Sequence, residues 1–237
     1  MVSNDINKRE VRVMSILGFR PISRLTLTMT VIAVIAAGAM GANVGRKLVD
    51  AGNIVLTDLD GRSDATRKRA HDAGMIPASW TDIIRKADMI LSIIPPRDAF
   101  SFAERVLAEF QDNERIDKAP LVFADCNAVN VVTIKKIAAL FSTSSIVFLD
   151  ACIIGGPPSG DCVPTFYGSA DVVDQQGLTL FKNVIEKSGI KVRILSGDGA
   201  GIGDASALKM SYAASISLQL LVLTDIDKFL LRVFLKV

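Results

Sequence analysis

The stretch "VIAVIAAGAMGANVG" (residues 31–45) decides the fold, because an apolar, β-branched run gives way to glycines and then to helix-forming residues. In a G-x-G-x-x-G turn, the first glycine permits the tight turn, the second lets the backbone approach a pyrophosphate, and the third lets the helix pack on the strand. This chain has Ala36 at the first position and keeps Gly38 and Gly41 at the other two. Taken alone, the stretch fits a dinucleotide-binding turn and a plain strand–helix junction equally well.

The rest of the chain alternates β-branched runs with helical patterns. We predict strands over 30–35, 54–57, 89–94, 121–124, 146–149, 164–167 and 192–195. The predicted helices between them cover 41–51, 62–73, 98–110, 131–141 and 173–187. Nearly continuous Val/Ile/Leu strands joined by crossover helices are typical of a parallel sheet covered on both faces. The sequence therefore predicts a doubly wound, Rossmann-type α/β fold with a mainly parallel sheet, which binds ligands beyond the carboxyl ends of its strands.

We expect three parts along the chain: an N-terminal arm over residues 1–28 that is poorly ordered, the α/β domain over 29–203, and a long helix over 204–237. The last part has neither Gly nor Pro from Ala205 onward, so it is predicted to form one long helix or two in sequence. It is apolar on nearly all sides and is therefore expected to be buried. Asp225, Asp227 and Lys228 interrupt its apolar run, which argues against a membrane span.

Composition excludes several classes of function. The 27 basic and 25 acidic residues give a net charge of +2, which argues against a nucleic-acid partner. The three cysteines form no CxxC pair and His71 is the sole histidine, so no metal site is expected. Scattered thiols favour a reducing compartment; we expect a cytoplasmic protein, with a mitochondrial location as the open alternative.

Candidate cofactor-binding residues follow the predicted strands. The helix start at Ala39, Met40 and Gly41 offers unpaired N–H groups to an anion. Asp58 ends the second strand about twenty positions after Gly38, where an acid binds the adenine ribose hydroxyls and favours NAD.

The residues after Asp58 keep a second interpretation open. If Asp58 turns away, Arg62 and Ser63 in "DLDGRS" could hold the 2′-phosphate of NADP, and a solvated turn is the plainer alternative. The choice between NAD and NADP therefore stays open. Pro95, in "SIIPPRDAF", directs the chain outward to a loop expected to meet the nicotinamide half.

Candidate substrate-binding residues follow the later strands. Asn127 can donate and accept hydrogen bonds at once, although Asn is also a common turn residue. Gly155 and Gly156 follow the fifth strand, and Lys209 lies near the start of the last helix. A lysine facing a cleft can serve as a proton donor and acceptor, whereas a lone helix lysine is more often a solvent-exposed charge.

These segments occur in an order that resembles a known family. AGAMG follows the first strand, NA the fourth and DxxxxGG the fifth, and GxGxxxxxK opens the long helix. Over about residues 29–215 the chain resembles the β-hydroxyacid dehydrogenases, which include 3-hydroxyisobutyrate dehydrogenases and the nucleotide-binding domain of 6-phosphogluconate dehydrogenases.

The resemblance implies oxidation of a small hydroxy acid with NAD or NADP, or the reverse reduction. Lys209 would take the hydroxyl proton as the hydride leaves. Gly155 and Gly156 would hold the substrate through backbone N–H groups, and Asn127 would orient the substrate or the nicotinamide ribose.

The chain also departs from the family pattern. Ile154 replaces a serine before the glycine pair, and Tyr212 stands where the family often has Asn, so Tyr212 is the candidate polar partner of the substrate. Family members continue into an all-α domain, whereas this chain stops at Val237. We therefore expect either a homodimer in which a partner subunit covers the long helix, or a truncated, catalytically impaired NAD(P)-binding protein.

Overall fold

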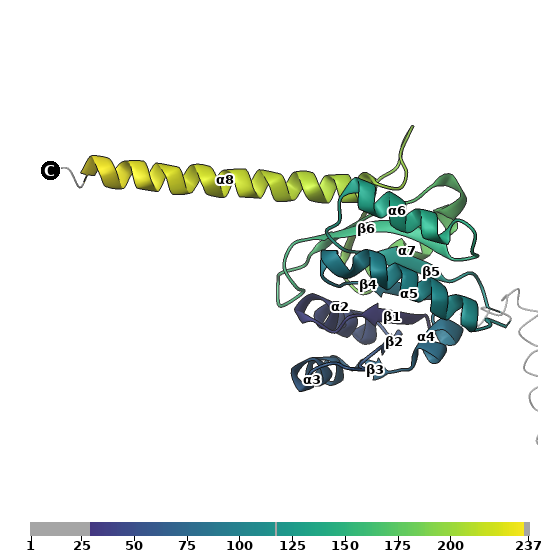
Figure 1. Cartoon of the computed structure of the whole chain (residues 1–237). Helices are drawn as coiled ribbons and strands as arrows, with labels where there is room; N and C mark the ends of the chain where they lie inside the picture. Colours follow the sequence, from purple (N-terminus) through teal and green to yellow (C-terminus); the bar gives the residue numbers. More distant parts are fainter. Residues whose placement is uncertain (1–28, 117, 235–237) are drawn as a thin grey trace, which may run out of the picture.

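The computed structural model describes residues 29–116 and 118–234, with side-chain environments up to Gln219. The arm predicted over residues 1–28 lies outside these ranges. The described chain forms an eight-stranded sheet of order β3-β2-β1-β4-β5-β6-β7-β8 (Figure 1). Every neighbouring pair of strands is parallel except β6 and β7. The predicted doubly wound, mainly parallel α/β fold is confirmed.

The elements carry the labels of Figure 1, in which the helices begin at α2. The strands are β1 (Val31–Ile35), β2 (Ile54–Thr57), β3 (Ile76–Pro77), β4 (Met89–Ser92), β5 (Val122–Asp125), β6 (Val147–Ile154), β7 (Thr165–Ser169) and β8 (Lys191–Ile194). The helices are α2 (Ala39–Asp50), α3 (Asp64–Asp72), α4 (Trp80–Lys86), α5 (Ala99–Asp112), α6 (Val131–Phe141), α7 (Gln175–Lys187) and α8 (Asp204–Phe234), with short 3₁₀ turns η1 (Pro96–Asp98) and η2 (Val172–Asp174).

The sheet is buried between two helical layers. Successive side chains of a strand point to opposite faces, so Ile32 and Val34 of β1 join one core cluster while Ala33 and Ile35 join the other. Buried residues of α2, α3 and α7 complete the first cluster, and those of α4, α5 and α6 complete the second. This two-sided cover explains why most strands read as apolar runs in the sequence.

Several predicted boundaries were wrong, and two elements were missed. The edge strand β3 has only two residues, both exposed, and α4 has only seven residues, so neither has a long apolar pattern. The sequence places the fifth strand at 146–149, but β6 continues to Ile154 because it pairs with antiparallel β7. Helix α3 begins at Asp64 rather than Arg62, since Ser63 is its N-cap and accepts a hydrogen bond from the Thr66 N–H.

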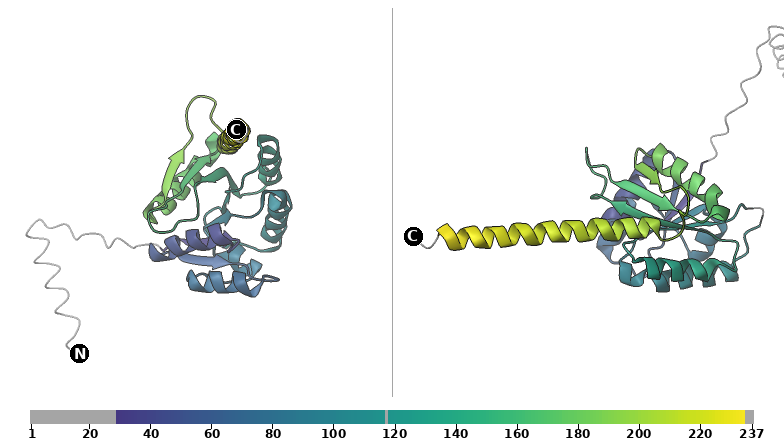
Figure 2. Two further views of the ribbon diagram at one scale, coloured as in Figure 1. Left: turned by 90° about the vertical axis from the view of Figure 1, so that its left-hand side faces the viewer. Right: turned by 90° about the horizontal axis from the view of Figure 1, so that it is seen from above.

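The last element is one long helix. The first residues of α8 contact β6, β7 and α6, and the helix then projects away from the body of the molecule (Figures 1 and 2). Residues 211–219 are all exposed, including Ile216 and Leu218. The burial expected for this helix is therefore not provided by the described part of the chain. Among the described residues, no helix is both long enough and apolar enough to cross a membrane.

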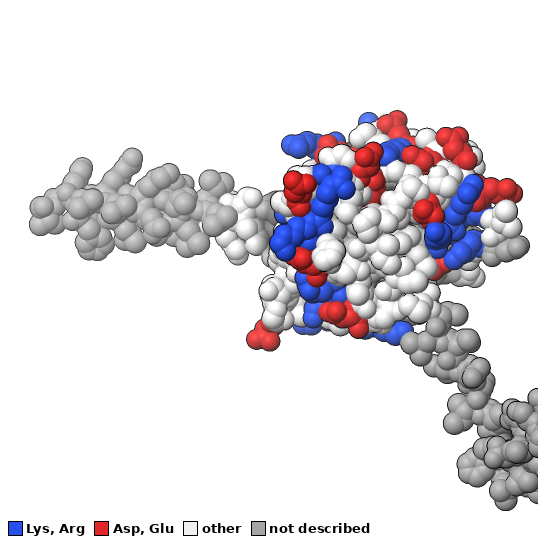
Figure 3. All heavy atoms as spheres, turned by 90° about the horizontal axis from the view of Figure 1, so that it is seen from below, with Lys and Arg blue, Asp and Glu red and all other residues white. Residues whose placement is uncertain are grey.

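The surface reflects the balanced charge of the sequence. On the face shown in Figure 3, basic and acidic side chains are intermixed around an uncharged central area. No continuous basic surface is seen on this face of the described residues. Any anion site on this side of the molecule must therefore be local.

Candidate functional site

The turn between β1 and α2 has the shape that an approaching anion requires. Gly38 is the N-cap of α2 and has no side-chain cap, while its N–H donates to the Ala36 carbonyl (2.9 Å). A Cβ at Gly38 would meet no atom within 4 Å, so this position faces open space. A Cβ at Gly41 would lie 1.9 Å from the Ala36 oxygen, so only glycine allows this close packing of the helix on the strand. The first N–H groups of α2, from Ala39 and Met40, have no partner within the helix.

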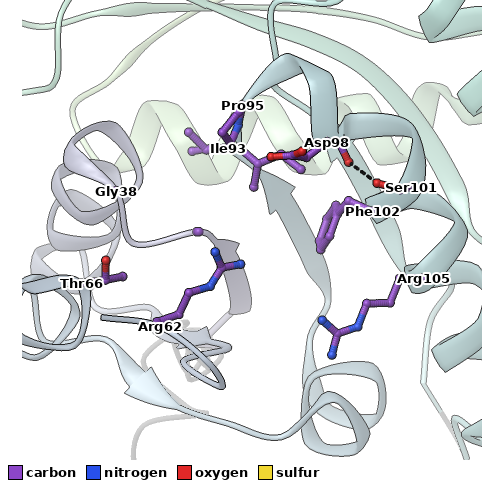
Figure 4. A pocket seen from close by; sticks show the side chains of 11 residues that line it. Gly38, Arg62, Thr66, Ile93, Pro95, Asp98, Ser101, Phe102 and Arg105 are labelled. Atoms are coloured by element: carbon purple, nitrogen blue, oxygen red, sulfur yellow. Dashed lines mark hydrogen bonds between the residues drawn. The ribbon is translucent and has the colours of Figure 1, made fainter. Parts of the chain in front are cut away.

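A pocket of about 460 Å³ lies beside this turn (Figure 4). Its walls come from the turn, the β2–α3 connection, the end of β4 and the start of α5, and it is lined by Ala36, Gly38, Arg62, Thr66, Ile93, Ile94, Pro95, Asp98, Ser101, Phe102 and Arg105. The structure therefore brings three of the predicted cofactor residues together: Gly38, Arg62 and Pro95. Ser63 does not line the pocket, because its hydroxyl caps α3.

Asn127 is buried and joins the ends of two strands. Its Oδ1 accepts a hydrogen bond from the Ile94 N–H (2.7 Å), and its Nδ2 donates to Ser92 Oγ (2.8 Å). These bonds fix the segment that carries Pro95 into the pocket. Asn127 thus supports the cofactor side of the site through the backbone, and direct contact with a ligand stays a prediction.

Asp58 lies at the end of β2 as predicted, but its carboxylate is enclosed. Its Oδ2 accepts a hydrogen bond from Trp80 Nε1 (2.9 Å), and its Oδ1 accepts one from the Asp60 N–H (3.0 Å). Arg105 Nη1 lies 3.8 Å from the same Oδ2 and its guanidinium covers the Trp80 ring, 4.7 Å from the centroid. Sequence reasoning missed Trp80 and Arg105, because α4 and α5 carry no local motif that points to the end of β2.

Lys209 contacts the end of β6, close in the chain to Gly155 and Gly156. Lys209 Nζ donates to the Ile153 carbonyl (2.7 Å), two residues before Gly155. Gly155 has a φ of +119°, which favours glycine, and both Gly155 and Gly156 are exposed. Tyr212 lies three residues after Lys209, so both are on neighbouring positions of one helix face. The structure therefore places Lys209 beside the glycine pair, while contact of any of these residues with substrate stays a prediction.

The base of α8 is fixed by Asp150, a buried residue of β6 that opens the DxxxxGG motif and to which sequence reasoning assigned no role. Its carboxylate accepts hydrogen bonds from the Gly203 N–H (2.9 Å), the Ser206 N–H (3.1 Å) and Ser206 Oγ (2.7 Å). Ser169 Oγ of β7 also donates to it (3.1 Å) and accepts from the Ala205 N–H (3.2 Å). Strands β6 and β7 thus pair the first N–H groups of α8, which a helix cannot pair internally.

Asp150 belongs to a row of buried polar residues that crosses the sheet. Ser92, Asp125, Asp150 and Ser169 are aligned in register on β4, β5, β6 and β7. Burial raises the pKa of Asp125 to about 7, although the Asn127 N–H donates to its Oδ1. Burial also raises the pKa of Asp150, against the effect of its hydrogen bonds from Ser206, Gly203 and Ser169. The row connects the Asn127 side of the site with the base of α8.

The described residues contain no set of side chains suited to bind a metal ion. No group of three or more His, Cys, Asp or Glu residues there could hold a metal ion. Cys126 and Cys152 are buried free thiols, and Cys162 is exposed.

The parallel sheet, the glycine turn and the pocket at its strand ends define a dinucleotide-binding domain. The open approach to Gly38 and the free N–H groups of α2 suit a pyrophosphate. Residues 31–193 match the family described as the NAD binding domain of 6-phosphogluconate dehydrogenase, and the chain belongs to this family. A comparison with curated proteins finds no match.

Solved structures share the fold at low sequence identity. A 3-hydroxyisobutyrate dehydrogenase from Mycobacterium tuberculosis, determined with L-serine, is 20% identical with a TM-score of 0.66, over 84% of this chain and 64% of that one. An imine reductase from Myxococcus stipitatus with NADP⁺ is 15% identical with a TM-score of 0.62, over 82% and 63%. A conserved protein of unknown function, described as similar to 3-hydroxyacid dehydrogenases, is 22% identical with a TM-score of 0.63, over 78% and 64%. The chain thus spans less than two thirds of these relatives.

Proposed function

We propose that this protein is an NAD(P)-dependent oxidoreductase of the β-hydroxyacid dehydrogenase type, which acts on a small hydroxy acid or a related carbonyl compound. Residues 29–203 form its nucleotide-binding domain, and α8 begins a helical second part. The observation that carries the proposal is the placement of Lys209, whose Nζ is held at the end of β6 beside Gly155 and Gly156. This end of β6 lies at the same sheet edge as Gly38 and Pro95, because β1, β4, β5 and β6 are parallel.

The residues divide the chemistry between them. A bound nicotinamide supplies the hydride donor or acceptor. The α2 N-terminus and Gly38 would hold the pyrophosphate of the dinucleotide, and Pro95 would position the loop beside its nicotinamide half. Lys209 would accept the hydroxyl proton at Nζ as the neutral amine in the oxidation and return it as the ammonium in the reduction, while the Ile153 carbonyl accepts a hydrogen bond from Nζ and orients it. Gly155 and Gly156 offer backbone N–H groups to the substrate, and Tyr212 is its polar partner.

The test measures binding and turnover separately. NADH and NADPH are titrated against the purified protein by fluorescence, and hydroxy acids are then screened with wild type, Lys209→Ala and Lys187→Ala. Lys187 is an exposed lysine in the last turn of α7 and serves as the matched control. Turnover that is lost only in Lys209→Ala supports the proposal. Failure to bind either dinucleotide would contradict it.

A nucleotide-binding protein without turnover is the second candidate. It is favoured by the exposure of residues 211–219, which leaves the side of the site beyond Lys209 uncovered by the described chain. Dinucleotide binding without Lys209-dependent turnover on any hydroxy acid would support this candidate over the first.

We also propose that α8 forms a homodimer contact. Support comes from Tyr212, Ile216 and Leu218, which are 42%, 40% and 63% exposed on the projecting helix. Sedimentation of wild type and of Leu218→Glu tests this contact. A wild-type protein that stays monomeric at high concentration would overturn it.

A further inference from the structure

Asp58, the acid at the position that selects NAD, is already hydrogen-bonded within the protein. Asp58 is only 6% exposed, and its Oδ2 accepts from the Trp80 indole and faces the Arg105 guanidinium. Each oxygen already accepts one hydrogen bond inside the protein, so the carboxylate would have to turn outward, away from the indole N–H, to present both oxygens to the two ribose hydroxyls of NAD. Trp80 is only 7% exposed, so its indole N–H would then lose its one recorded hydrogen-bond acceptor, at a cost in free energy. The geometry therefore opposes the usual role of an acid at this position.

Two arginine side chains line the pocket that lies next to the enclosed Asp58 carboxylate. Arg62 comes from the β2–α3 connection and Arg105 from α5, and both line the pocket beside Gly38. In Figure 4 their side chains enter the pocket from opposite walls, with Phe102 near Arg105. Arg105 also lines a neighbouring hollow of about 500 Å³ together with Asp58, Arg67 and Trp80. The stacking of Arg105 on the Trp80 ring restrains a long side chain that would otherwise lose entropy on binding.

Away from Asp98, the two adjoining hollows are lined by three arginines and two aspartates, an excess of one positive charge. Arg62, Arg67 and Arg105 face Asp58 and Asp60 in the two adjoining hollows, and Asp58 is already paired with Arg105. Asp98 lines the first pocket as well, but it lies near Pro95 in Figure 4, apart from Arg62 and Arg105. Guanidinium groups bind phosphate oxygens through paired hydrogen bonds, so two of them on opposite walls match a terminal phosphate.

We infer that the cofactor is NADP(H), and that Arg62 and Arg105 bind the 2′-phosphate of its adenosine ribose. Trp80 is a positioning residue in this inference: it holds Asp58 away from the ribose and supports Arg105. The inference rests on the proposed function, because it names the dinucleotide that the same site takes.

The protein contains its own reporter for the test. Trp80 is the sole tryptophan of the chain and lies against Arg105, so its fluorescence reports on a ligand at this position. We expect 2′,5′-ADP to bind at least about tenfold more tightly than 5′-AMP, because hydrogen bonds to a charged phosphate add to the affinity. The affinity for NADPH should exceed the affinity for NADH by a similar factor.

Calorimetry on four variants tests the role of each residue. Arg62→Ala and Arg105→Ala should each lower the affinity for 2′,5′-ADP by about 10- to 100-fold. The affinity of each variant for 5′-AMP should stay within about threefold of the wild-type value. Lys68→Ala is the control, because Lys68 lies on α3, pairs with Asp72 and does not line the pocket. It should change the affinity for neither ligand. Trp80→Phe should narrow the preference for NADPH over NADH, since it frees Asp58 for the ribose.

The outcomes separate this inference from the proposed function. Equal affinity for 2′,5′-ADP and 5′-AMP, or an unchanged preference in both arginine variants, would overturn NADP(H) selection while leaving dinucleotide binding intact. Arg62→Ala keeps the test valid if Arg105→Ala unfolds, because the Arg62 side chain makes no hydrogen bond or ion pair within the described residues. A protein that binds neither NADH nor NADPH would overturn the proposed function and, with it, this inference.

Discussion

The two halves of the candidate site differ in how much of their structure this chain provides. At the β1–β4 side, the turn, the arginines and the Pro95 segment enclose a pocket formed entirely by described residues. At the β6–α8 side, Lys209 donates a hydrogen bond to the Ile153 carbonyl, but residues 211–219 of α8 are all exposed. The difference teaches that the strand ends, together with α2, α3 and α5, complete the pocket of the first half, whereas the second half has no such cover among the described residues. Binding and turnover should therefore respond to different substitutions.

The largest expected effect tests whether the nucleotide half depends on one open backbone position. Gly38→Val should reduce dinucleotide affinity by roughly a hundredfold or more, because the new side chain occupies the path by which the pyrophosphate reaches the backbone. The fold should remain, since a Cβ at Gly38 meets no atom within 4 Å and the backbone there is extended. Calorimetry with NADPH measures the affinity, and a thermal melt measures whether the fold is retained. Normal binding by the variant would place the pyrophosphate elsewhere.

The substrate half should depend on its anchor to the sheet. Asp150→Asn should lower the free energy of unfolding by about 2–4 kcal/mol, because an amide nitrogen would face N–H groups that now donate to a carboxylate. Hydrogen exchange should accelerate in residues 203–209, while dinucleotide affinity changes little. Ser188→Ala, which removes a buried serine hydroxyl distant in sequence from this row, is a comparison variant. Unchanged exchange at the base of α8 in Asp150→Asn would show that other contacts hold the helix.

Gly41 lies in the same turn as Gly38, but a substitution there should affect the stability of the protein. Gly41→Ala should destabilise the protein by about 1–3 kcal/mol, since its Cβ would lie 1.9 Å from the Ala36 oxygen and the helix must move away from the strand. Denaturant unfolding of Gly38→Ala and Gly41→Ala compares the two positions directly. Equal stability of the two variants would contradict the close packing at Gly41.

The buried row that joins the halves should make the stability of the protein depend on pH. The folded-state pKa of Asp125 is raised to about 7, above its unfolded value, so the folded protein binds the proton more tightly. Its contribution to stability is fully present below about pH 4 and is lost as the pH rises through about 7, with a slope of at most about 1.4 kcal/mol per pH unit. Asp125→Asn should flatten this part of the stability profile. Asp150, whose pKa is also raised, still titrates in the variant, so the difference between the two melting profiles isolates Asp125. Identical profiles for wild type and variant would mean that Asp125 is ionised in the folded protein.

Much of the fold could be predicted from the sequence, because buried parallel strands must be apolar on both faces and glycines mark the turn. Gly38 and Pro95 were predicted from their positions after strands, and the structure places both in one pocket, while their role in binding stays a prediction. The short elements β3 and α4 were missed, since two exposed residues and a seven-residue helix leave no periodic pattern. Arg105 was missed because it lies mid-helix, where an arginine is usually a solvated charge.

The sequence by itself determined the alternation of strands and helices, the glycine turn and the polar residues at the strand ends, because these depend on local pattern and neighbouring residues. Only the tertiary structure decided what those polar residues face. It places the Trp80 indole and the Arg105 guanidinium on Asp58, 22 and 47 positions away along the chain, and so turns an apparent NAD acid into part of an arginine-lined pocket. Such partners come together because crossover helices bring distant segments to one edge of a parallel sheet, and no local sequence pattern records that packing.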